Sequence, residues 1–489
     1  MNPGERLARL AQRSPERVAL LFADRHVTFG DWDARANALA AWLAEQGVER
    51  RCPVALVLPN GPDFPLLHLA IMKLGAVAMP IDPRLGESEL LALIEQSAAR
   101  LTIVPEAFAR EAALAGRTRV VTLGSAEVQE VLAGAASAPP IAAPEVAGDP
   151  ALYLPTSGTT GRPRAVVLSY ANLDCFPAAL SAVLDTTERD ILVMAVPMSH
   201  ISGPILLNEI LDKGSTLSIP AAPAPSLILE AITRHRVTWM HSVPPIFQGM
   251  LRALKPDHDL STLRIAAMMG TSVPIPVLRA LAQVCPQAAI IQGYGLTETS
   301  PLLTLLPVAD ATRRCGSVGK AVPGAELRIV DEQGAELPAG EPGQLIARGP
   351  MLMDGYLNDE VASAERIRAG FFWTGDIMSR DEEGFYYHLG RADDMIVTGR
   401  GLNVFPAEVE NALLTHPATH DVAVAGVETG DGLAVKAWVV LMRGSDASAI
   451  ELRRHCSERL ASFKVPKQIS FADEIPRNPM NKVLRAELG

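Results

Sequence analysis

The stretch Leu154-Pro155-Thr156-Ser157-Gly158-Thr159-Thr160-Gly161-Arg162-Pro163-Arg164 lies between two short apolar runs, residues 151–154 and 165–168. This pattern predicts a polar loop that joins two strands. Glycines let backbone N–H groups come close to a ligand, and hydroxyl and guanidinium groups donate hydrogen bonds to anionic oxygens. The stretch therefore predicts a loop that binds polyphosphate. The alternative is a polar surface turn, although such turns usually contain less Ser and Thr.

The spacing of this loop differs from that of the common Walker phosphate loop, which needs G-x-x-x-x-G-K-[ST]. Here the two glycines are three positions apart, and Arg-Pro-Arg follows them. The nearest other candidate, Gly319-Lys320, lacks both the upstream Gly and the following Ser or Thr. We therefore expect a phosphate loop of another kind.

The loop resembles the signature Thr-Ser-Gly-Thr-Thr-Gly-x-Pro-Lys of the adenylate-forming superfamily. Members include acyl-CoA synthetases, adenylation domains of non-ribosomal peptide synthesis and beetle luciferases. Further motifs of this family follow in the family's order, and they are Tyr294-Gly295-Leu296-Thr297-Glu298, Trp373-Thr374-Gly375-Asp376, Gly390-Arg391-Ala392-Asp393-Asp394 and Asn478-Pro479-Met480-Asn481-Lys482. The resemblance extends from about residue 27 to the end of the chain, and the motifs together are highly specific.

The composition indicates a globular protein of several domains. A chain of 489 residues is longer than a domain with a single hydrophobic core usually is. A content of 48% hydrophobic and 20% charged residues is typical of a soluble protein. Because 55 acidic residues outnumber 44 basic ones, giving a net charge of −11, nucleic acid is not an expected partner.

Neither a signal sequence nor a membrane span is expected. The longest apolar stretch, residues 64–81, is interrupted by Pro65, His68, Lys73 and Pro80. Five cysteines lie far apart without a C-x-x-C pair, which favours buried thiols over a zinc site. These features predict a cytoplasmic protein, and we expect a monomer or a homodimer.

Strands and helices alternate in the first hundred residues. The periodicity predicts helices at 62–74 and 88–97, with apolar strands at 54–58, 76–80 and 101–104. Apolar strands separated by helices indicate parallel sheets that are covered on both faces. The expected fold is therefore α/β, with a large N-terminal domain of doubly wound sheets over residues 1–392.

Two smaller units are expected towards the C-terminus. Short strands with Gly/Pro turns at 316–349 predict a small β-rich subdomain. Residues 393–489 read as a smaller α+β domain, with helices at 406–415 and 449–460 and strands at 421–427, 435–441 and 468–471. The resemblance implies that this domain is mobile and that its hinge lies at Asp393.

The resemblance implies an enzyme that activates a carboxylic acid with ATP and Mg²⁺. The product of this step is an acyl adenylate, and transfer to the thiol of CoA then gives acyl-CoA, AMP and pyrophosphate. An alternative is a stand-alone adenylating enzyme that loads the acyl group onto a carrier protein. A non-catalytic binding protein of the same fold is disfavoured, because the motif residues Thr297, Glu298, Asp376, Arg391 and Lys482 are intact.

Several motifs supply the residues that the resemblance assigns to ATP. These residues are Thr156, Ser157, Gly158, Thr159, Thr160, Gly161, Arg164, Gly270, Thr271, Tyr294, Thr297, Asp376, Arg391 and Lys482. Tyr294 is expected at the adenine, Thr297 at the α-phosphate and Asp376 at the ribose hydroxyls. The family has Lys where Arg164 stands, and Arg keeps the charge but presents a planar fork.

Four residues are expected to act on the reacting groups. By resemblance, Lys482 bridges the substrate carboxylate and the α-phosphate, Thr297 contacts that phosphate, and Glu298 holds Mg²⁺. His200 lies in a stretch that matches the family's Pro-x-x-His-x-x-Gly, near the acyl carbon. The alternative for His200 is a histidine that is hydrogen-bonded inside a loop. Asn481 replaces the family's Gly before the lysine, and Asn tolerates left-handed backbone angles.

The resemblance also implies the position of the acid. The expected pocket residues are His200, Trp239, His241, Val243, Phe247, Gly270, Gly293 and Leu302. The missing side chain at Gly293 leaves room for a ring or an acyl chain, and the bulk of Trp239 and Phe247 disfavours very long chains. Because the expected pocket residues include no Lys, Arg or carboxylate, an ammonium group on the substrate would be unpaired there. We therefore expect a monocarboxylic medium-chain fatty or aryl acid and exclude α-amino acids.

The CoA side is expected on the C-terminal domain. By resemblance, this domain rotates about Asp393 after adenylation and presents Gly399, Arg400 and Gly401, which would line a tunnel for pantetheine.

Overall fold

The structure, a computed structural model, describes most of the chain. The described residues are 1–106, 108–156, 164–270, 273, 275–311, 313–314, 316–399, 401–430, 432–477 and 483–488. Eight of the expected site residues lie outside them, namely Ser157, Gly158, Thr159, Thr160, Gly161, Thr271, Arg400 and Lys482.

A seven-stranded sheet is built mainly from the first 170 residues. Its strand order is β18-β8-β7-β4-β3-β5-β6. The strands are β3 (Pro53–Val57), β4 (Val77–Ile81), β5 (Leu101–Val104), β6 (Arg119–Thr122), β7 (Pro150–Thr156), β8 (Arg164–Ser169) and β18 (Gly355–Tyr356). The first five run parallel, whereas β8 pairs antiparallel with both β7 and β18. Strands β7 and β8, which flank residues 157–163, therefore confirm the two expected strands, whereas the predicted loop itself lies outside the described residues.

A nine-stranded sheet follows, in the order β15-β14-β13-β12-β11-β9-β10-β1-β2. Its strands are β1 (Val18–Phe22), β2 (Arg25–Thr28), β9 (Ile191–Met194), β10 (Thr216–Ser218), β11 (Trp239–Ser242), β12 (Ile265–Met268), β13 (Ala289–Tyr294), β14 (Thr304–Leu305) and β15 (Lys320–Ala321). The N-terminal hairpin β1–β2 joins this sheet because β1 pairs parallel with β10. The sequence did not predict this pairing.

Helices cover both faces of the two sheets. They are α1 (Pro3–Arg13), α2 (Phe29–Glu45), α3 (Asp63–Lys73), α4 (Glu87–Ser97), α5 (Glu111–Leu114), α6 (Ala126–Ala133), α7 (Tyr170–Leu173), α8 (Cys175–Ser181), α9 (Ser202–Lys213), α10 (Pro225–His235), α11 (Pro244–Ala253) and α12 (Ile275–Val284). The largest hydrophobic cluster includes residues of both sheets, and a second cluster includes Met240 of β11 with residues of α10, α11 and α12. The doubly wound α/β fold is therefore confirmed.

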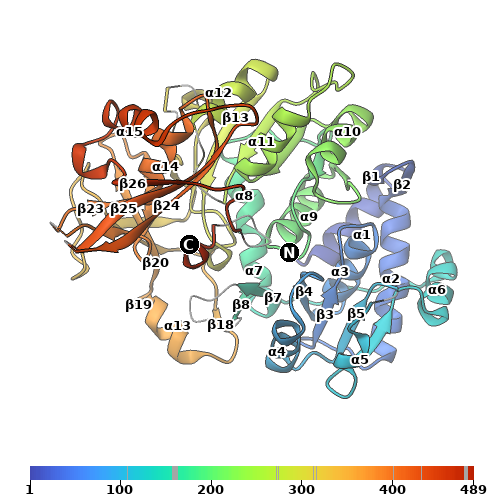
Figure 1. The fold of residues 1–489 in the computed structure, drawn as a ribbon. Coiled ribbons are helices and arrows are strands. Elements are labelled where there is room, and N and C mark those ends of the chain that lie inside the picture. Colours follow the sequence, from blue (N-terminus) through green and yellow to red (C-terminus); the bar gives the residue numbers. More distant parts are fainter. Residues whose placement is uncertain are drawn as a thin grey trace.

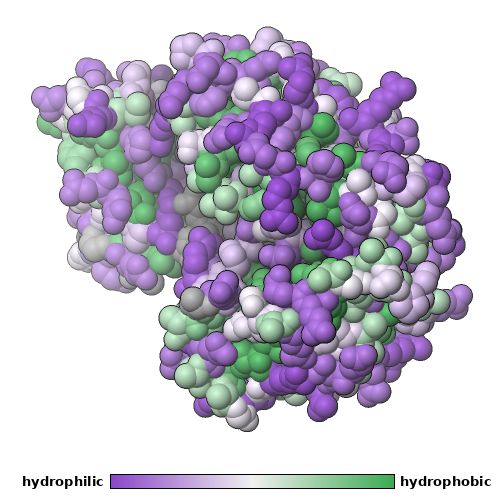
Figure 2. Space-filling view, turned by 90° about the vertical axis from the view of Figure 1, so that its right-hand side faces the viewer, coloured by the Kyte–Doolittle hydropathy of each residue, from purple (hydrophilic) through white to green (hydrophobic). Residues whose placement is uncertain are grey.

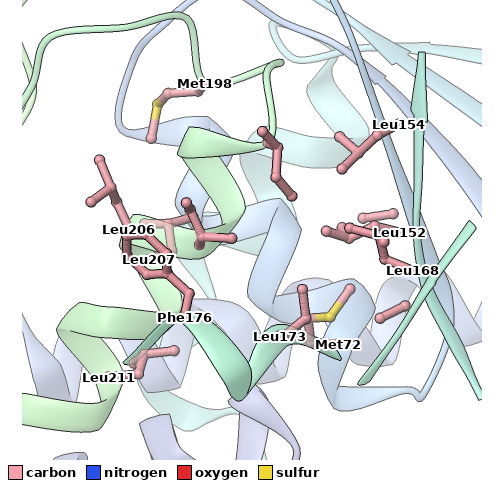
Figure 3. Close-up of a cluster of buried hydrophobic side chains, with 14 of the residues drawn as sticks. Met72, Leu152, Leu154, Leu168, Leu173, Phe176, Met198, Leu206, Leu207 and Leu211 are labelled. Carbon is pink, nitrogen blue, oxygen red and sulfur yellow. The ribbon is translucent and has the colours of Figure 1, made fainter. Parts of the chain in front are cut away.

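The central core packs α9 against the seven-stranded sheet. Figure 3 shows Leu206, Leu207 and Leu211 of α9 on one side and Leu152, Leu154 and Leu168 of β7 and β8 on the other. These leucines are at most 3% exposed. Burying one such side chain contributes about 1.5–3 kcal/mol, so this core fixes β7 and β8 firmly on either side of the polar loop.

The β-rich subdomain is larger than the sequence predicted. Its five strands are β16 (Glu326–Val330), β17 (Gly343–Arg348), β19 (Ile367–Arg368), β20 (Phe371–Arg380) and β21 (Tyr386–Arg391), with helix α13 (Glu360–Arg366) beside them. The expected bounds of 316–349 miss β20, which pairs antiparallel with β17 and with β21. The subdomain therefore extends to Arg391.

The C-terminal unit has its own core. Its elements are β22 (Ile396–Val397), β23 (Asn403–Val404), α14 (Pro406–Leu414), β24 (Thr419–Thr429), β25 (Gly432–Leu441), α15 (Ala449–Ser457) and β26 (Gln468–Phe471). Strand β24 pairs antiparallel with β25, which pairs parallel with β26. Figure 1 shows this α+β domain, in orange and red, on the side of the molecule opposite β1, β2 and α6.

The helices within the described ranges are all too short or too polar to cross a membrane. Hydrophilic side chains cover much of the face in Figure 2, and hydrophobic groups are scattered among them. The outline in this view is indented between a smaller lobe and the main body.

Candidate active site

A cavity of about 310 Å³ lies between the N-terminal and C-terminal domains. Five residues expected at the site line it, namely Gly270, Gly293, Tyr294, Asp376 and Arg391. His388 joins them from the N-terminal side, and the C-terminal domain contributes Asp394, Ala407, Glu410, Arg477, Val483 and Arg485. The cavity therefore collects motifs that are up to about 200 residues apart in the chain.

A buried carboxylate, Asp376, forms the centre of one wall. Tyr294 donates its hydroxyl to Asp376 Oδ2 at 2.7 Å, and Arg391 Nη1 donates to the same oxygen at 3.4 Å. His388 Nε2 lies 3.1 Å from Oδ1. We call Tyr294, Asp376, His388 and Arg391 the Asp376 cluster. Asp376 is only 3% exposed, so these polar contacts compensate for its lost hydration.

The β20–β21 hairpin explains how this cluster forms. Asp376 on β20 stands opposite Arg391 on β21 in the antiparallel register, which shifts just beyond this pair. Thr374 Oγ1 accepts a hydrogen bond from the Asp376 N–H at 3.0 Å. Tyr294, the last residue of β13, stacks on His388 with ring centroids 5.7 Å apart. Two sheets therefore fix the carboxylate and the tyrosine relative to each other.

The cluster keeps Asp376 ionised. Burial alone would raise the pKa of this carboxyl, but the hydrogen bond and charge of His388, with Arg391 and Tyr294, hold the pKa below its usual range. Burial and the neighbouring Asp376 charge raise the pKa of the Tyr294 phenol, which stays protonated. The cluster therefore presents an anionic carboxylate inside the cavity, beside a neutral aromatic hydroxyl.

Close packing requires a glycine at position 295 and leaves little room for a side chain at position 293. A Cβ on Gly295 would lie 1.6 Å from the Pro301 carbonyl oxygen, so no other residue fits there. A Cβ on Gly293 would lie 3.0–3.1 Å from Met269, the Thr304 carbonyl and Leu302. The space that the sequence assigned to the acid beside Gly293 is thus bordered closely by protein atoms, although Gly293 lines the cavity.

The ends of the polar loop meet across β7 and β8. Thr156 pairs with Arg164 in the antiparallel ladder, and Thr156 Oγ1 donates to the Arg164 carbonyl at 3.4 Å. Arg164 Nε lies 3.2 Å from Asp359 Oδ2. The guanidinium also lies 5.7 Å from the centroid of the Tyr356 ring. The described ends of the loop thus include one cation that is held by a carboxylate and a ring.

Glu298 contacts the same tyrosine, Tyr356. It belongs to the 3₁₀ turn Thr297–Thr299, and its Oε1 accepts the Tyr356 hydroxyl at 2.9 Å. Within the described ranges, no three His, Cys, Asp or Glu side chains gather as metal ligands. One carboxylate suits Mg²⁺, which commonly takes one or two protein carboxylates together with substrate phosphates and water. Glu298 therefore fits the expected metal role.

His200, Ser202 and His241 form a second cluster, which we call the His241 cluster. The Ser202 hydroxyl lies 3.2 Å from His200 Nδ1 and 3.4 Å from His241 Nε2. Burial lowers the pKa of both histidines to about 4, and the proximity of His200 adds to the effect on His241. His241 Nδ1 is buried and finds no hydrogen-bond partner among the residues described. Both imidazoles are therefore neutral at pH 7.

The remaining expected pocket residues do not all meet. Trp239 shares a face of β11 with His241, is 1% exposed, and its Nε1 lacks a partner in the described part of the chain. Val243 Cγ1 lies 3.2 Å from the Cβ position of Gly270. Phe247, in contrast, is fully buried with Met240 in the cluster that includes α10, α11 and α12. The expectation that Trp239 and Phe247 bound one slot is therefore wrong, because they lie in separate cores.

The C-terminal edge of the cavity is organised by Arg485. Its guanidinium donates to Glu410 Oε1 at 2.9 Å, to Asp394 Oδ2 at 3.2 Å and to the Val424 carbonyl at 3.1 Å. Burial raises the pKa of Glu410, although Arg485 opposes this shift. Arg477 and Val483, which flank the segment 478–482, form an antiparallel bridge and both line the cavity.

The expected CoA side lies elsewhere. Gly401 N–H donates to Thr398, and Gly399 N–H donates to Leu433 at 3.2 Å beside the β24–β25 turn. Neither glycine lines the cavity. Asp393, the expected hinge residue, pairs with Arg391 at 3.5 Å. The structure therefore does not bring Gly399 and Gly401 together with the Asp376 cluster.

The sequence analysis missed His388 and Tyr356. His388 could have been found by folding the hairpin about the turn at residues 381–384, which brings the strand before Arg391 back alongside Asp376. Tyr356 gives no such signal, because its partner Glu298 is 58 residues away and belongs to another element.

Two family descriptions match this chain. A model described as AMP-binding enzyme matches residues 7–357, and one described as AMP-binding enzyme C-terminal domain matches residues 408–482. Together these matches cover both sides of the cavity.

Relatives of known activity align over nearly the whole chain. A 2-succinylbenzoate–CoA ligase from Geobacillus kaustophilus is 36% identical over 97% of this chain and 95% of that protein. A feruloyl-CoA synthase from Amycolatopsis sp. is 34% identical over 98% of this chain and 97% of that protein.

A solved structure shares the arrangement of the whole chain. It is an o-succinylbenzoate CoA synthetase from Bacillus subtilis in complex with its acyl-adenylate intermediate, with a TM-score of 0.89 and 31% identity over 99% of this chain and 97% of that one. The same enzyme has also been solved with ATP and a magnesium ion, with a TM-score of 0.86, 30% identity, and coverage of 99% of this chain and 98% of that one.

Proposed function

The chain belongs to the AMP-binding enzyme family and is an AMP-forming carboxylate–CoA ligase, and we propose that its substrate is a monocarboxylic aryl or medium-chain acid. It uses ATP with Mg²⁺ to form an acyl adenylate, then transfers the acyl group to the CoA thiol. The observation that carries the site assignment is the buried, ionised Asp376 in a cavity between the domains.

The chemistry explains why no protein nucleophile is needed. A carboxylate resists nucleophilic attack because it is anionic and lacks a good leaving group, whereas an acyl adenylate releases AMP. The protein must hold two anions together and stabilise the charge that moves to pyrophosphate, which is achieved by positioning and electrostatics. The residues of the site are therefore proposed to bind and orient, without forming a covalent intermediate.

The Asp376 cluster is proposed to hold the nucleoside. A carboxylate has about four lone-pair sites, and three side chains contact Asp376, so Asp376 can still accept a ribose hydroxyl beside these partners. The face of Tyr294 would contact adenine, and Arg391 would reach the ribose and phosphate side. Thr156 and Arg164 lie at the ends of the proposed phosphate loop, and Thr297 adjoins Glu298 as the proposed α-phosphate contact.

Lys482 is proposed as the residue that brings the two anions together. It lies outside the described residues, but its chain neighbour Val483 lines the cavity, as does Arg477 on the other side of that segment. A domain boundary at residues 392/393 with a hinge at Asp393 remains part of the proposal. It is supported by the end of β21 at Arg391 and by the separate core that includes Ile396.

The acid is proposed to bind beside the His241 cluster. Neutral histidines, Trp239 and Val243 offer hydrogen bonds and apolar surface but no charge to pair with a second ionic group. An ammonium buried there without a partner would cost several kcal/mol. Aryl acids are favoured within the class, because one aligned relative is named as a feruloyl-CoA synthase and ferulate is an aryl monocarboxylate.

A substrate screen tests this proposal. Purified protein with Mg-ATP and CoA would be offered aryl acids, fatty acids of increasing length and α-amino acids, and both pyrophosphate and acyl-CoA would be measured. We expect acyl-CoA and AMP with an aryl or medium-chain acid. Turnover of an α-amino acid would refute the pocket assignment, and adenylate discharged only by a carrier protein would refute free CoA as acceptor.

The cellular setting also remains a proposal. We propose a cytoplasmic monomer or homodimer, and the four described cysteines, Cys52, Cys175, Cys285 and Cys456, are all free thiols. Cell fractionation and size-exclusion chromatography with light scattering test these two points.

A further inference from the structure

Glu298 is held at two points by one short segment that the family motifs did not identify. The Met353 N–H donates to the Glu298 carbonyl at 2.9 Å, which fixes the backbone. The Tyr356 hydroxyl donates to Glu298 Oε1 at 2.9 Å, which fixes the side chain. Backbone and carboxylate are therefore both fixed by residues 353–356.

This segment is itself rigidly attached to the phosphate-loop strand. Gly355 and Tyr356 form β18, which pairs with Val167 and Val166 of β8. The Tyr356 N–H donates to Ser363 Oγ at 2.8 Å, and the Tyr356 side chain is buried against the central core. The protein therefore holds the Tyr356 side chain in place, and the Tyr356 hydroxyl bonds to Glu298 without a bound ligand.

The Tyr356 ring also contacts the cation at the end of the polar loop. Arg164, the first residue of β8, places its guanidinium 5.7 Å from the ring centroid, and Asp359 Oδ2 lies 3.2 Å from its Nε. Tyr356 thus links two groups that belong to different motifs, the loop arginine and the expected metal carboxylate.

We propose that Tyr356 is a positioning residue that holds the Glu298 carboxylate in place for the Mg²⁺ of Mg-ATP. This inference rests on the proposed role of Glu298. The hydrogen bond engages Oε1 and fixes the carboxylate orientation, while Oε2 accepts no hydrogen bond from the described residues, which leaves its lone pairs for a cation. Hydrogen-bond partners of ligating side chains typically change metal affinity about 10–100-fold when they are removed.

The test is Tyr356→Phe, which keeps the ring and its packing but removes the hydroxyl. ATP binding without acid or CoA would be measured by calorimetry over a range of free Mg²⁺ concentrations. We expect the Mg²⁺ midpoint to rise about tenfold, with ATP affinity near that of wild type once Mg²⁺ saturates. An unchanged midpoint would overturn the proposal, as would a loss of ATP affinity that saturating Mg²⁺ does not restore.

Tyr387→Phe is the matched control. The Tyr387 hydroxyl also bonds to a carboxylate, Asp381 Oδ2 at 3.1 Å, but this pair lies in the β-rich subdomain and Asp381 is not a proposed magnesium ligand. We expect this variant to keep the wild-type Mg²⁺ midpoint. An equal shift in both variants would overturn the specific link to Glu298.

Combining Tyr356→Phe with Glu298→Gln distinguishes the positioning role of Tyr356 from the proposed metal-binding role of Glu298. Glu298→Gln alone should raise the midpoint further than Tyr356→Phe, and combining the two changes should add nothing to Glu298→Gln. Additive effects would overturn the positioning role of Tyr356. A wild-type midpoint in Glu298→Gln would instead remove Glu298 from the metal site, and failure of wild-type protein to make acyl-CoA would refute the proposed function.

Discussion

The Asp376 cluster and the His241 cluster are both buried, yet the ionisable groups of one stay charged and those of the other become neutral. Asp376 stays charged because Tyr294, His388 and Arg391 surround it. His200 and His241 give up their charge, since burial lowers the pKa of each to about 4. One cluster therefore offers an anion held by three side-chain partners, and the other offers neutral imidazoles, with a His241 nitrogen that is unpaired among the described residues.

This difference shows how one site can handle two chemically distinct substrates. A fixed charge favours a polar nucleoside through directional hydrogen bonds, whereas a neutral surface excludes substrates that carry an extra charge. If the assignments are correct, nucleotide affinity and acid selectivity should respond to separate mutations. The predictions below test that separation.

The largest effect is expected for Lys482→Ala, because this lysine is proposed to join the substrates of the two clusters. Removing a charge-stabilising donor typically lowers kcat about 10²–10³-fold. We expect that loss in ATP-dependent adenylation, measured by pyrophosphate release, but near wild-type conversion of a supplied acyl adenylate to acyl-CoA. Lys464→Ala, which removes a lysine paired with Glu408 in the same domain, is the control. Equal losses in both half-reactions would contradict a role confined to adenylation.

Asp376→Asn should weaken ATP binding while leaving the acid unaffected. Hydrogen bonds to a charged group contribute about 1.5–3 kcal/mol, which corresponds to a rise in the ATP Kd of about 10–100-fold. Calorimetry gives the Kd, and steady-state kinetics at saturating ATP give the KM of the acid. Glu383→Gln, an exposed carboxylate of the same subdomain, should change neither value. An equal rise in the KM of the acid would show that the two clusters do not act separately.

The converse is predicted for His200→Ala. Loss of its hydrogen bond with Ser202 and of its contact with the acid should raise the KM of the acid about tenfold, as expected for one neutral hydrogen bond and its packing. The ATP Kd should stay at the wild-type value by calorimetry. His235→Ala, which removes a partly buried histidine bonded to Ser218 outside the His241 cluster, serves as the control. A change in ATP affinity alone would show that His200 does not face the acid.

The two clusters should also lose stability in different pH ranges. A histidine whose folded pKa is about 4 binds fewer protons than in the unfolded chain, whose pKa is about 6.5, so acidification from pH 6.5 towards 4 destabilises the fold. Asp376 has a lowered folded pKa, so its contribution is present above the unfolded value near 4 and is lost only below it. Thermal melting against pH should therefore be less steep between pH 6.5 and 4 in His241→Asn, and unchanged there in Asp376→Asn. The opposite pattern would contradict the charge states.

The smallest effect is expected for Arg164→Lys. Lysine keeps the positive charge at the end of the polar loop, so kcat and the ATP KM should stay within about twofold, as for exposed charge contacts. Arg164→Ala should raise the KM of ATP more than that of the acid, because the charge itself is removed. Steady-state kinetics with each substrate varied decide this point. A selective rise in the KM of the acid would show that the loop does not face the phosphates.

Regular elements were predicted well where the signal was local. The strands at Leu101–Val104 and Gln468–Phe471 agree with the expected bounds, because short apolar runs between turns leave few alternatives. The N-terminal hairpin was missed because its parallel partner β10 lies about 200 residues further along the chain. Long-range pairing of this kind depends on the fold as a whole and leaves no periodic mark in either strand.

The site residues, like the regular elements, were predicted where the sequence signal was local and missed where it was not. The motifs supplied Tyr294, Asp376 and Arg391, which line one cavity. His388 and Tyr356 were missed because strand register, rather than motif spacing, brings them to Asp376 and Glu298. Phe247 was misassigned because closeness in sequence to β11 does not reveal that the following helix places it in the cluster on the far face of the sheet.

Arg391 contacts both the proposed nucleoside carboxylate Asp376 and the proposed hinge residue Asp393. One guanidinium nitrogen lies 3.4 Å from Asp376, and another lies 3.5 Å from Asp393. Any rotation about Asp393 that breaks the second contact changes the electrostatic environment of the first. In thermodynamic terms this is linkage: if the nucleotide binds the two domain orientations unequally, it shifts their populations, and the orientation changes nucleotide affinity by the same factor. Arg391 thus provides a physical route by which nucleotide binding and the orientation of the C-terminal domain influence each other.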